Sequence, residues 1–382
     1  MKNEEMRMNN STFYIEHYEL KKIDMKRKSL LLIVVMFALA SLSSINAQEK
    51  KKLIGDYLSI SGWMNIQYDL EQQEKNDGTF TDVNTFNVRR ARLDLKGNIS
   101  PNLEFRVQGD FAGTPKLVDG FVKIKLQKYF NIQVGQFKIP FTFENPQSPL
   151  TLEGVEYAQV IDKLSGYNDI SGVTTYAGGR DVGVMIYGDL FKFEHDGKEI
   201  PIVTYKLGMF NGNGMNKKDA NLLKDIAASV EVCPGVKGLM LATSYYDGNY
   251  KLEALDKKDA MRDRLTFGGK YENGKLTVRS EYITGKTDMV KNDEIYNLNS
   301  DGFYVSAGYW FNMKEQKIRP VARYDFFRED VTEVNTNSTY YMVGVDWWPY
   351  KNLRLLVNYT LKDKAQNDNF GHLLQAQLSV KF

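Results

Sequence analysis

From about residue 58 to its last residue, the chain alternates apolar and polar side chains with a period of two. In the C-terminal segment 374–382, apolar residues from Leu374 to Phe382 take the even positions, whereas Gln375, Gln377 and Lys381 take odd ones. Successive side chains of a strand point to opposite faces, so this pattern predicts β-strands. After residue 48 we find no helical period of useful length. The pattern therefore predicts an all-β chain.

About sixteen segments show this alternation, and in many of them the polar positions carry charges. Charged side chains on so many strands need water on one side, while the apolar positions need lipid or a core on the other. The alternation thus predicts a transmembrane antiparallel β-barrel of about sixteen strands with a water-filled lumen. A terminal aromatic, here Phe382, is habitual in outer-membrane barrels. A soluble sandwich is the alternative.

The connectors between these segments alternate in length, as expected for long outer loops and short periplasmic turns. Short turns include 100–101, 233–235, 272–275 and 349–351, and the outer connector 113–116 is also brief. The segment 139–180 is the longest without a pattern, so a loop folded into the lumen would have to be there. The longer connectors are expected near 70–84, 139–180, 211–222, 248–262, 285–301, 329–338 and 362–371.

Aromatic residues gather near the expected strand ends. Trp310, Trp347, Trp348, Tyr340 and Tyr341 fit the aromatic girdles that membrane proteins place at the two interfaces. The core of a sandwich would be the alternative place for them.

Ahead of the strands lies a targeting segment. Lys26, Arg27 and Lys28 precede an apolar run of 13 residues from Leu30 to Leu42, and Ser43-Ser44-Ile45-Asn46-Ala47 follows, in which Ile45 is larger than the residue usual at that place. This layout is typical of a secretory signal peptide, since a helix that crosses a bilayer needs roughly 20 apolar residues. We expect residues 1–47 to be removed, with 1–24 non-native or the product of a mistaken start. Residues 48–57 then form a short N-terminal segment before a single barrel domain, 58–382.

Charge and composition exclude several classes of protein. Residues 1–47 hold seven basic and five acidic side chains, so the remaining chain has 43 of each and is formally neutral. Neutrality argues against a nucleic-acid partner, which requires a basic surplus. One cysteine, Cys233, allows no intramolecular disulfide, and three histidines are a poor inventory for metal or catalytic sites. We expect no metal and no cofactor.

Five motifs give the chain a resemblance to a known family. They are Phe86–Leu93 (FNVRRARL), Val134–Phe141 (VGQFKIPF), Gly179–Val184 (GRDVGV), Phe210–Gly214 (FNGNG) and Arg319–Asp325 (RPVARYD). With these motifs the chain resembles the phosphate-selective porin O and P family of outer-membrane channels. The resemblance implies a homotrimer in the outer membrane of a Gram-negative bacterium, with lipid around it and a third loop that narrows each lumen. It also implies passive diffusion of small hydrophilic solutes, in particular anions such as phosphate or polyphosphate.

Basic side chains in the lumen would carry anion transfer, because they replace part of the hydration shell of a phosphate. Phe382 is expected to help the barrel assembly machinery recognise the chain. The candidates for pore lining or anion binding are Arg90, Arg92, Lys96, Arg106, Lys123, Lys125, Arg180, Arg319, Arg323 and Arg354.

Other interpretations stay open. The same strand parity brings about as many carboxylates inside, so balanced rows of charge could serve a general-diffusion porin without phosphate specificity. The family implies a lysine cluster and an arginine ladder, yet the third loop offers only Lys163 and Arg180. A structural or adhesion barrel, or an outer-membrane enzyme, is the alternative of another class. We expect no enzyme, since His195 and His372 lack a neighbouring nucleophile.

The direction of Arg90 and Arg92 depends on a change of parity at Val88 and Arg89. Phe86 and Val88 fall on the opposite face from the apolar residues that follow. A β-bulge at this point would turn these side chains to the other face.

Overall fold

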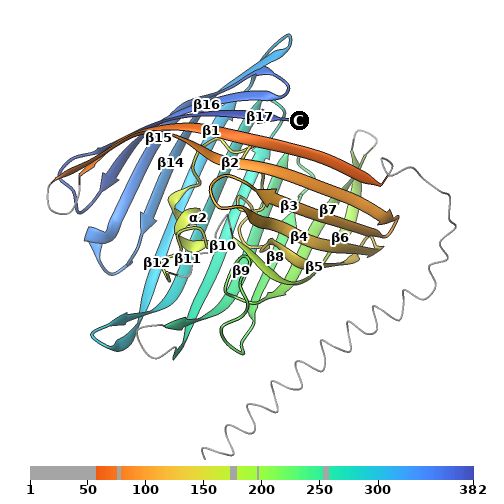
Figure 1. Ribbon diagram of the computed structural model, residues 1–382, viewed down its shortest axis with the longest axis horizontal. Coiled ribbons are helices and arrows are strands. Elements are labelled where there is room, and N and C mark those ends of the chain that lie inside the picture. Colours follow the sequence, from red (N-terminus) through yellow and green to blue (C-terminus); the bar gives the residue numbers. More distant parts are fainter. Residues whose placement is uncertain (1–56, 75–78, 173–178, 196–197, 253–257) are drawn as a thin grey trace, which may run out of the picture. The chain divides into compact units, whose positions relative to one another are not determined.

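A computed structural model describes residues 57–74, 79–172, 179–195, 198–252 and 258–382. The expected signal peptide and residues 48–56 lie outside these ranges. Within them, seventeen strands form one sheet, and its last strand pairs antiparallel with its first, so the sheet closes into a barrel (Figure 1). The strands are β1 Leu58–Glu74, β2 Phe80–Ser100, β3 Leu103–Asp110, β4 Lys116–Gln127, β5 Phe130–Lys138, β6 Arg180–His195, β7 Lys198–Phe210, β8 Asp225–Val232, β9 Leu239–Leu252, β10 Lys258–Glu272, β11 Leu276–Lys291, β12 Glu294–Tyr309, β13 Phe311–Met313, β14 Gln316–Arg328, β15 Asn337–Tyr350, β16 Leu353–Lys364 and β17 Gly371–Lys381.

The barrel has sixteen strand positions. β12 and the short β13 follow each other along the same neighbour, β14, and are separated only by Trp310. They therefore fill one position between them. The prediction of a transmembrane antiparallel barrel of about sixteen strands is confirmed.

The seam where the barrel closes shows why the sequence alternates. Asn65 Nδ2 donates to Gln377 Oε1 at 2.9 Å, and Gln377 Nε2 donates to Gln67 Oε1 at 2.8 Å. These three side chains are buried inside the barrel, whereas Met64 and Ile66, the two sequence neighbours of Asn65, are exposed. Polar side chains thus satisfy one another in the lumen, and apolar ones face outward.

A β-bulge interrupts β2 at the place predicted from the change of parity. Asn65 pairs with Arg90 and the next residue, Ile66, pairs with Val88, so Arg89 is the extra residue. The bulge brings both Arg89 and Arg90 to the inside, where they line one cavity. The predicted bulge is confirmed.

Some segments expected to be long outer loops are strands. β11 and β12 remain paired up to Lys291 and Glu294, and only Asn292 and Asp293 form the turn, with positive φ angles of 53° and 62°. The expectation of a loop over 285–301 is therefore wrong. Beyond the bilayer, neither face of a hairpin has to be apolar, so the alternation fades although the strands continue.

The girdle interpretation is wrong for Trp310 and Trp348. Arg319 lies over the ring of Trp310 at 4.5 Å, and Arg354 lies over Trp348 at 5.8 Å. Both arginines are buried inside the barrel. The indoles of Trp310 and Trp348 therefore point toward the lumen, where a cation can cover the ring face.

The connector between β5 and β6 spans residues 139–179, and we call it the third loop; its described residues fill part of the lumen. It contains the helix α2, Gln159–Leu164, whose Val160, Ile161 and Leu164 are buried. α2 lies within the ring of strands (Figure 1) and contacts β11, β12 and β14. A second helix, the 3₁₀ turn η4, spans Val334–Thr336. In the described part of the chain, no helix is long and apolar enough to cross a membrane.

Candidate functional site

The third loop is fastened to the barrel wall by buried ion pairs. Arg319 Nη1 on β14 lies 2.9 Å from Glu153 Oε1 of the loop, and Arg279 Nη2 on β11 lies 3.5 Å from the same oxygen. Arg319 also pairs with Asp346 on β15 at 2.7 Å. A buried carboxylate needs such partners, since burial of an unpaired charge is costly.

Two further arginines hold the backbone of the loop. Arg354 Nη2 on β16 donates to the carbonyl of Leu152 at 2.6 Å, and Arg323 Nη1 on β14 donates to the carbonyl of Glu156 at 2.9 Å. Arg319, Arg323 and Arg354 were predicted as pore-lining or anion-binding residues. The structure brings them together against the third loop, where they donate to loop carbonyls and to the carboxylates of Glu153 and Asp346.

Carboxylates of the same part of the wall also bind the loop. Glu281 on β11 accepts hydrogen bonds from the backbone amides of Phe143 and Glu144, at 2.8 and 3.1 Å. Asp325 on β14 accepts one from the amide of Gln159, the first residue of α2, at 2.9 Å. Burial raises the pKa of Glu144 above its usual range. The loop is therefore fixed to the β9–β16 side of the barrel.

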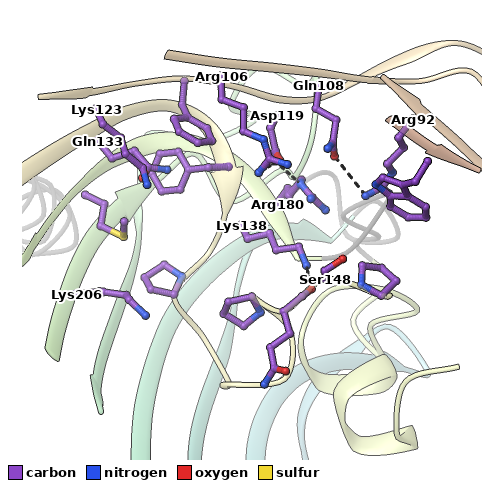
Figure 2. Close-up of a pocket in the computed structure, with 18 residues that line it drawn as sticks. Arg92, Arg106, Gln108, Asp119, Lys123, Gln133, Lys138, Ser148, Arg180 and Lys206 are labelled. Carbon is purple, nitrogen blue, oxygen red and sulfur yellow. Dashed lines mark hydrogen bonds and ion pairs between the residues drawn. The ribbon is translucent and has the colours of Figure 1, made fainter. Parts of the chain in front are cut away.

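Opposite this side, a cavity of about 320 Å³ separates the loop from strands β2 to β7. Figure 2 shows labelled basic side chains that extend from the strands into the cavity, with Lys138 directed toward the loop residues around Ser148. Asp119 is the one carboxylate among the residues that line it. The basic lining residues are Arg92, Arg106, Lys123, Lys138, Arg180 and Lys206.

A second cavity, of about 420 Å³, adjoins the first toward the outer ends of the strands. Arg92, Lys138, Pro149 and Arg180 line both cavities. The two spaces therefore meet at these residues, and we call Arg92, Lys138 and Arg180 the basic neck. The second cavity is also lined by the basic residues Arg89, Arg90 and Lys116 and by the carboxylates Asp110, Glu156 and Asp162.

Carboxylates neutralise only part of the basic neck. Arg92 Nε lies 3.0 Å from Asp110 Oδ2, and Arg180 Nε lies 2.6 Å from Asp119 Oδ1. Lys138 Nζ instead donates to two loop carbonyls, those of Asn145 at 2.5 Å and Gln147 at 2.6 Å. Among the described residues Lys138 makes no ion pair, so no carboxylate neutralises it directly.

The remaining predicted site residues lie at different places. Arg106 is shared between Asp94, at 2.8 Å, and Asp119, at 3.0 Å. Lys123 makes no ion pair within the described part of the chain and lies 5.6 Å from the ring of Phe121. Lys96 is half exposed and 3.3 Å from Asp94, and Lys125 pairs with Glu104; neither lines the two cavities.

Our sequence reasoning missed Lys138, Arg89 and Lys116. Lys138 is the last residue of β5, directly before the third loop, so its side chain lies beside that loop. This position directly before the loop was the sequence signal that could have identified Lys138. Arg89 could have been found from the bulge, because an extra residue changes which side chains point inward.

The sequence also matches a known protein family. A family model described as phosphate-selective porin O and P matches residues 63–280 and 255–382. No curated protein matches the sequence.

Solved structures of porins match the fold. The anion-selective porin from Comamonas acidovorans is 12% identical with a TM-score of 0.62, and the match covers 85% of this chain and 99% of that one. OprB of Pseudomonas putida is 10% identical with a TM-score of 0.60, and coverage is 86% and 95%. The trimer form of OmpT from Vibrio cholerae is 13% identical with a TM-score of 0.57, and coverage is 85% and 99%.

Proposed function

Because this chain belongs to the phosphate-selective porin O and P family, we propose that it admits small anions, such as phosphate or polyphosphate, through the basic neck. The chain is an outer-membrane porin, and solutes cross it by passive diffusion. What we propose is the identity of the solute and the residues that select it.

The observation that carries the proposal is the composition of the neck. The two cavities share three basic lining residues, while the buried carboxylates of the β9–β16 side are engaged by arginines or loop amides. An anion that leaves bulk water needs donors to replace its hydration shell, and guanidinium and ammonium groups supply them. The third loop narrows the lumen to this side.

Lys138 is the group best placed to prefer an anion. Its Nζ donates to neutral carbonyls and to no described carboxylate, so no bonded acid cancels its positive charge. Arg92 and Arg180 each have a carboxylate partner and therefore contribute donors more than net charge. Since charge in a narrow, partly dry passage is poorly screened, a single lysine can set the sign of the preference.

A general-diffusion porin is the second candidate. The ion pairs of Arg106 with Asp94 and Asp119 favour a general-diffusion porin, because balanced charge keeps a pore wet without selecting an anion. Phosphate block distinguishes the two candidates. If phosphate fails to block the chloride current, the porin lacks phosphate specificity even when it prefers anions.

The test is phosphate block of the chloride current of single channels in planar bilayers. We expect phosphate to block the wild type, and Lys138→Gln to weaken the block about tenfold, the loss expected for one charge-assisted hydrogen bond. Lys96→Gln is the matched control, since Lys96 lies on β2, as Arg92 does, but lines neither cavity. Equal block in all three proteins would contradict the role of the neck.

Assembly is also part of the proposal. We infer a homotrimer in a Gram-negative outer membrane, surrounded by lipid, after removal of residues 1–47 and insertion by the barrel assembly machinery. The trimer form of a structurally similar porin supports the oligomeric state. Family and fold point to a channel and not to an enzyme.

A further inference from the structure

A third cavity, of about 680 Å³, opens at the end of the barrel that carries the short turns. We call it the mouth cavity. It is lined by the turn residues Gly274 and Lys351 and by Lys381 near the C-terminus. Short turns mark the periplasmic end of such barrels, so the mouth cavity faces the periplasm. Its volume is within the range of small-molecule sites.

The mouth cavity is separate from the basic neck. Leu150 and Thr151 of the third loop line it, and the flanking residues Leu152 and Glu153 are bonded to Arg354 and Arg319. Fastened loop residues therefore cover the cavity on the side away from the periplasm. A solute that enters the mouth cavity therefore meets loop residues that the wall holds in place.

Two indole rings lie in the wall of the mouth cavity. Arg319 covers Trp310 at 4.5 Å, and Lys381 covers Trp348 at 4.7 Å. Each ring is therefore held in place by a cation, which is the usual partner of an indole face. Of the four tryptophans, these two line this one cavity. Flat, rigid surfaces of this kind favour a ligand with a ring of its own.

Lysines without carboxylate partners surround the two rings. Lys317 and Lys351 line the mouth cavity and make no ion pair within the described ranges. Of the lining carboxylates, Asp346 is paired with Arg319 and Arg354. Glu272 and Glu315 are the other two. The free ammonium groups therefore give the pocket a preference for negative charge.

We propose that the mouth cavity binds an organic anion that carries a flat ring, such as an aryl phosphate or an aromatic carboxylate. The ring stacks on the indoles of Trp310 and Trp348, and Lys317 and Lys351 bind the anionic group. This site goes beyond passage through the neck, and its occupation does not depend on conduction.

The test is isothermal titration calorimetry of the full-length protein in detergent with 4-nitrophenyl phosphate. We expect binding that inorganic phosphate displaces only at much higher concentration, because phosphate lacks the ring. The double variant Lys317→Gln/Lys351→Gln and the single variant Trp310→Leu should each weaken binding about tenfold, in line with the loss of charge-assisted bonds or of aromatic stacking.

Three controls distinguish this site from others. Trp347→Phe removes a neighbouring tryptophan that does not line the cavity, and Lys275→Gln removes a lysine of an adjacent turn. Both should bind as the wild type does. Lys138→Gln tests the neck: if it alone weakens binding, the probe occupies the neck and the proposal is overturned.

Other results would also overturn the proposal. They are absence of binding by the wild type at millimolar probe, equal affinity for inorganic phosphate, and unchanged binding in both mouth-cavity variants. Heat-modifiable migration in gels checks that each variant is folded. If Trp310→Leu does not fold, the lysine double variant, whose side chains are exposed, decides the matter.

Discussion

Arg319 and Glu153 are 166 residues apart in sequence, yet their side chains meet at 2.9 Å inside the barrel, and both are buried. This ion pair joins β14 to the third loop. Because Arg279 shares the same carboxylate, Glu153 connects the loop to two separate strands of the wall.

Glu153→Gln should destabilise the protein and loosen the loop. Removal of one partner of a buried ion pair costs about 3 kcal/mol, because the cations stay buried with less compensation. Urea-dependent unfolding in detergent measures the loss, and single-channel noise should increase. Arg89→Gln is the control: the Arg89–Glu156 pair also reaches the loop but is about one-third exposed, so its loss should cost less than about 1 kcal/mol. Equal losses would contradict the anchoring role of Glu153.

Stability should depend on pH through Glu144. Burial raises the pKa of this carboxyl, so the folded protein binds the proton more tightly than the unfolded chain and loses stability as pH rises above the unfolded value of about 4.3. Glu144→Gln should therefore stabilise the protein at pH 8, and the gain should vanish near pH 4, where the carboxyl is protonated in both states. Unfolding midpoints at the two pH values measure this. A gain of equal size at both would exclude the explanation.

Gly135→Ala should prevent correct pairing of β4 and β5. Gly135 has a φ of 129°, and a Cβ there would lie 2.2 Å from the carbonyl oxygen of Gly120, which belongs to the neighbouring strand. The backbone of a paired strand cannot shift without a cost in free energy. We therefore expect Gly135→Ala to lower the free energy of unfolding by more than about 2 kcal/mol. Gly235→Ala is the comparison, since Gly235 has φ of 85° but open space around it. A larger loss at Gly235 would refute the steric argument.

Phe382→Ala should reduce assembly into the membrane. The backbone of Phe382 pairs with Gly62 in both directions, at 3.0 and 3.1 Å, while its side chain is 73% exposed. Because the ring contributes little buried area, its loss should leave the stability of refolded protein nearly unchanged. The yield of folded protein in outer-membrane fractions, compared with refolding in detergent, separates recognition from stability. Equal losses in both would point to a purely structural role.

Sequence reasoning reached the barrel, the strand number and the bulge at Arg89, since each depends on local alternation of side chains. It did not reach the continued pairing of β11 and β12, because outside the bilayer neither face of a hairpin has to be apolar. The inward direction of Trp310 and Trp348 also escaped it. Aromatic residues of the girdles and of the lumen both occur near strand ends. Only the alternation of inward and outward side chains after a break in the strand distinguishes them.

For the site, strand parity selected lumen cations but could not divide them into two groups. Arg319 and Arg354 hold the third loop, whereas Arg92 and Arg180 line the neck. That division depends on which side of the barrel the loop covers. Contacts between residues so distant in sequence leave no local pattern, so a single sequence does not reveal them.

The reversal potential of single channels in a potassium chloride gradient tests the central claim most directly. Because no described carboxylate neutralises Lys138 directly, the wild type should be anion-selective, and Lys138→Gln should move the reversal potential toward zero. Lys96→Gln should leave it in place. A cation-selective or non-selective wild type, or equal potentials in the wild type and Lys138→Gln, would contradict the account.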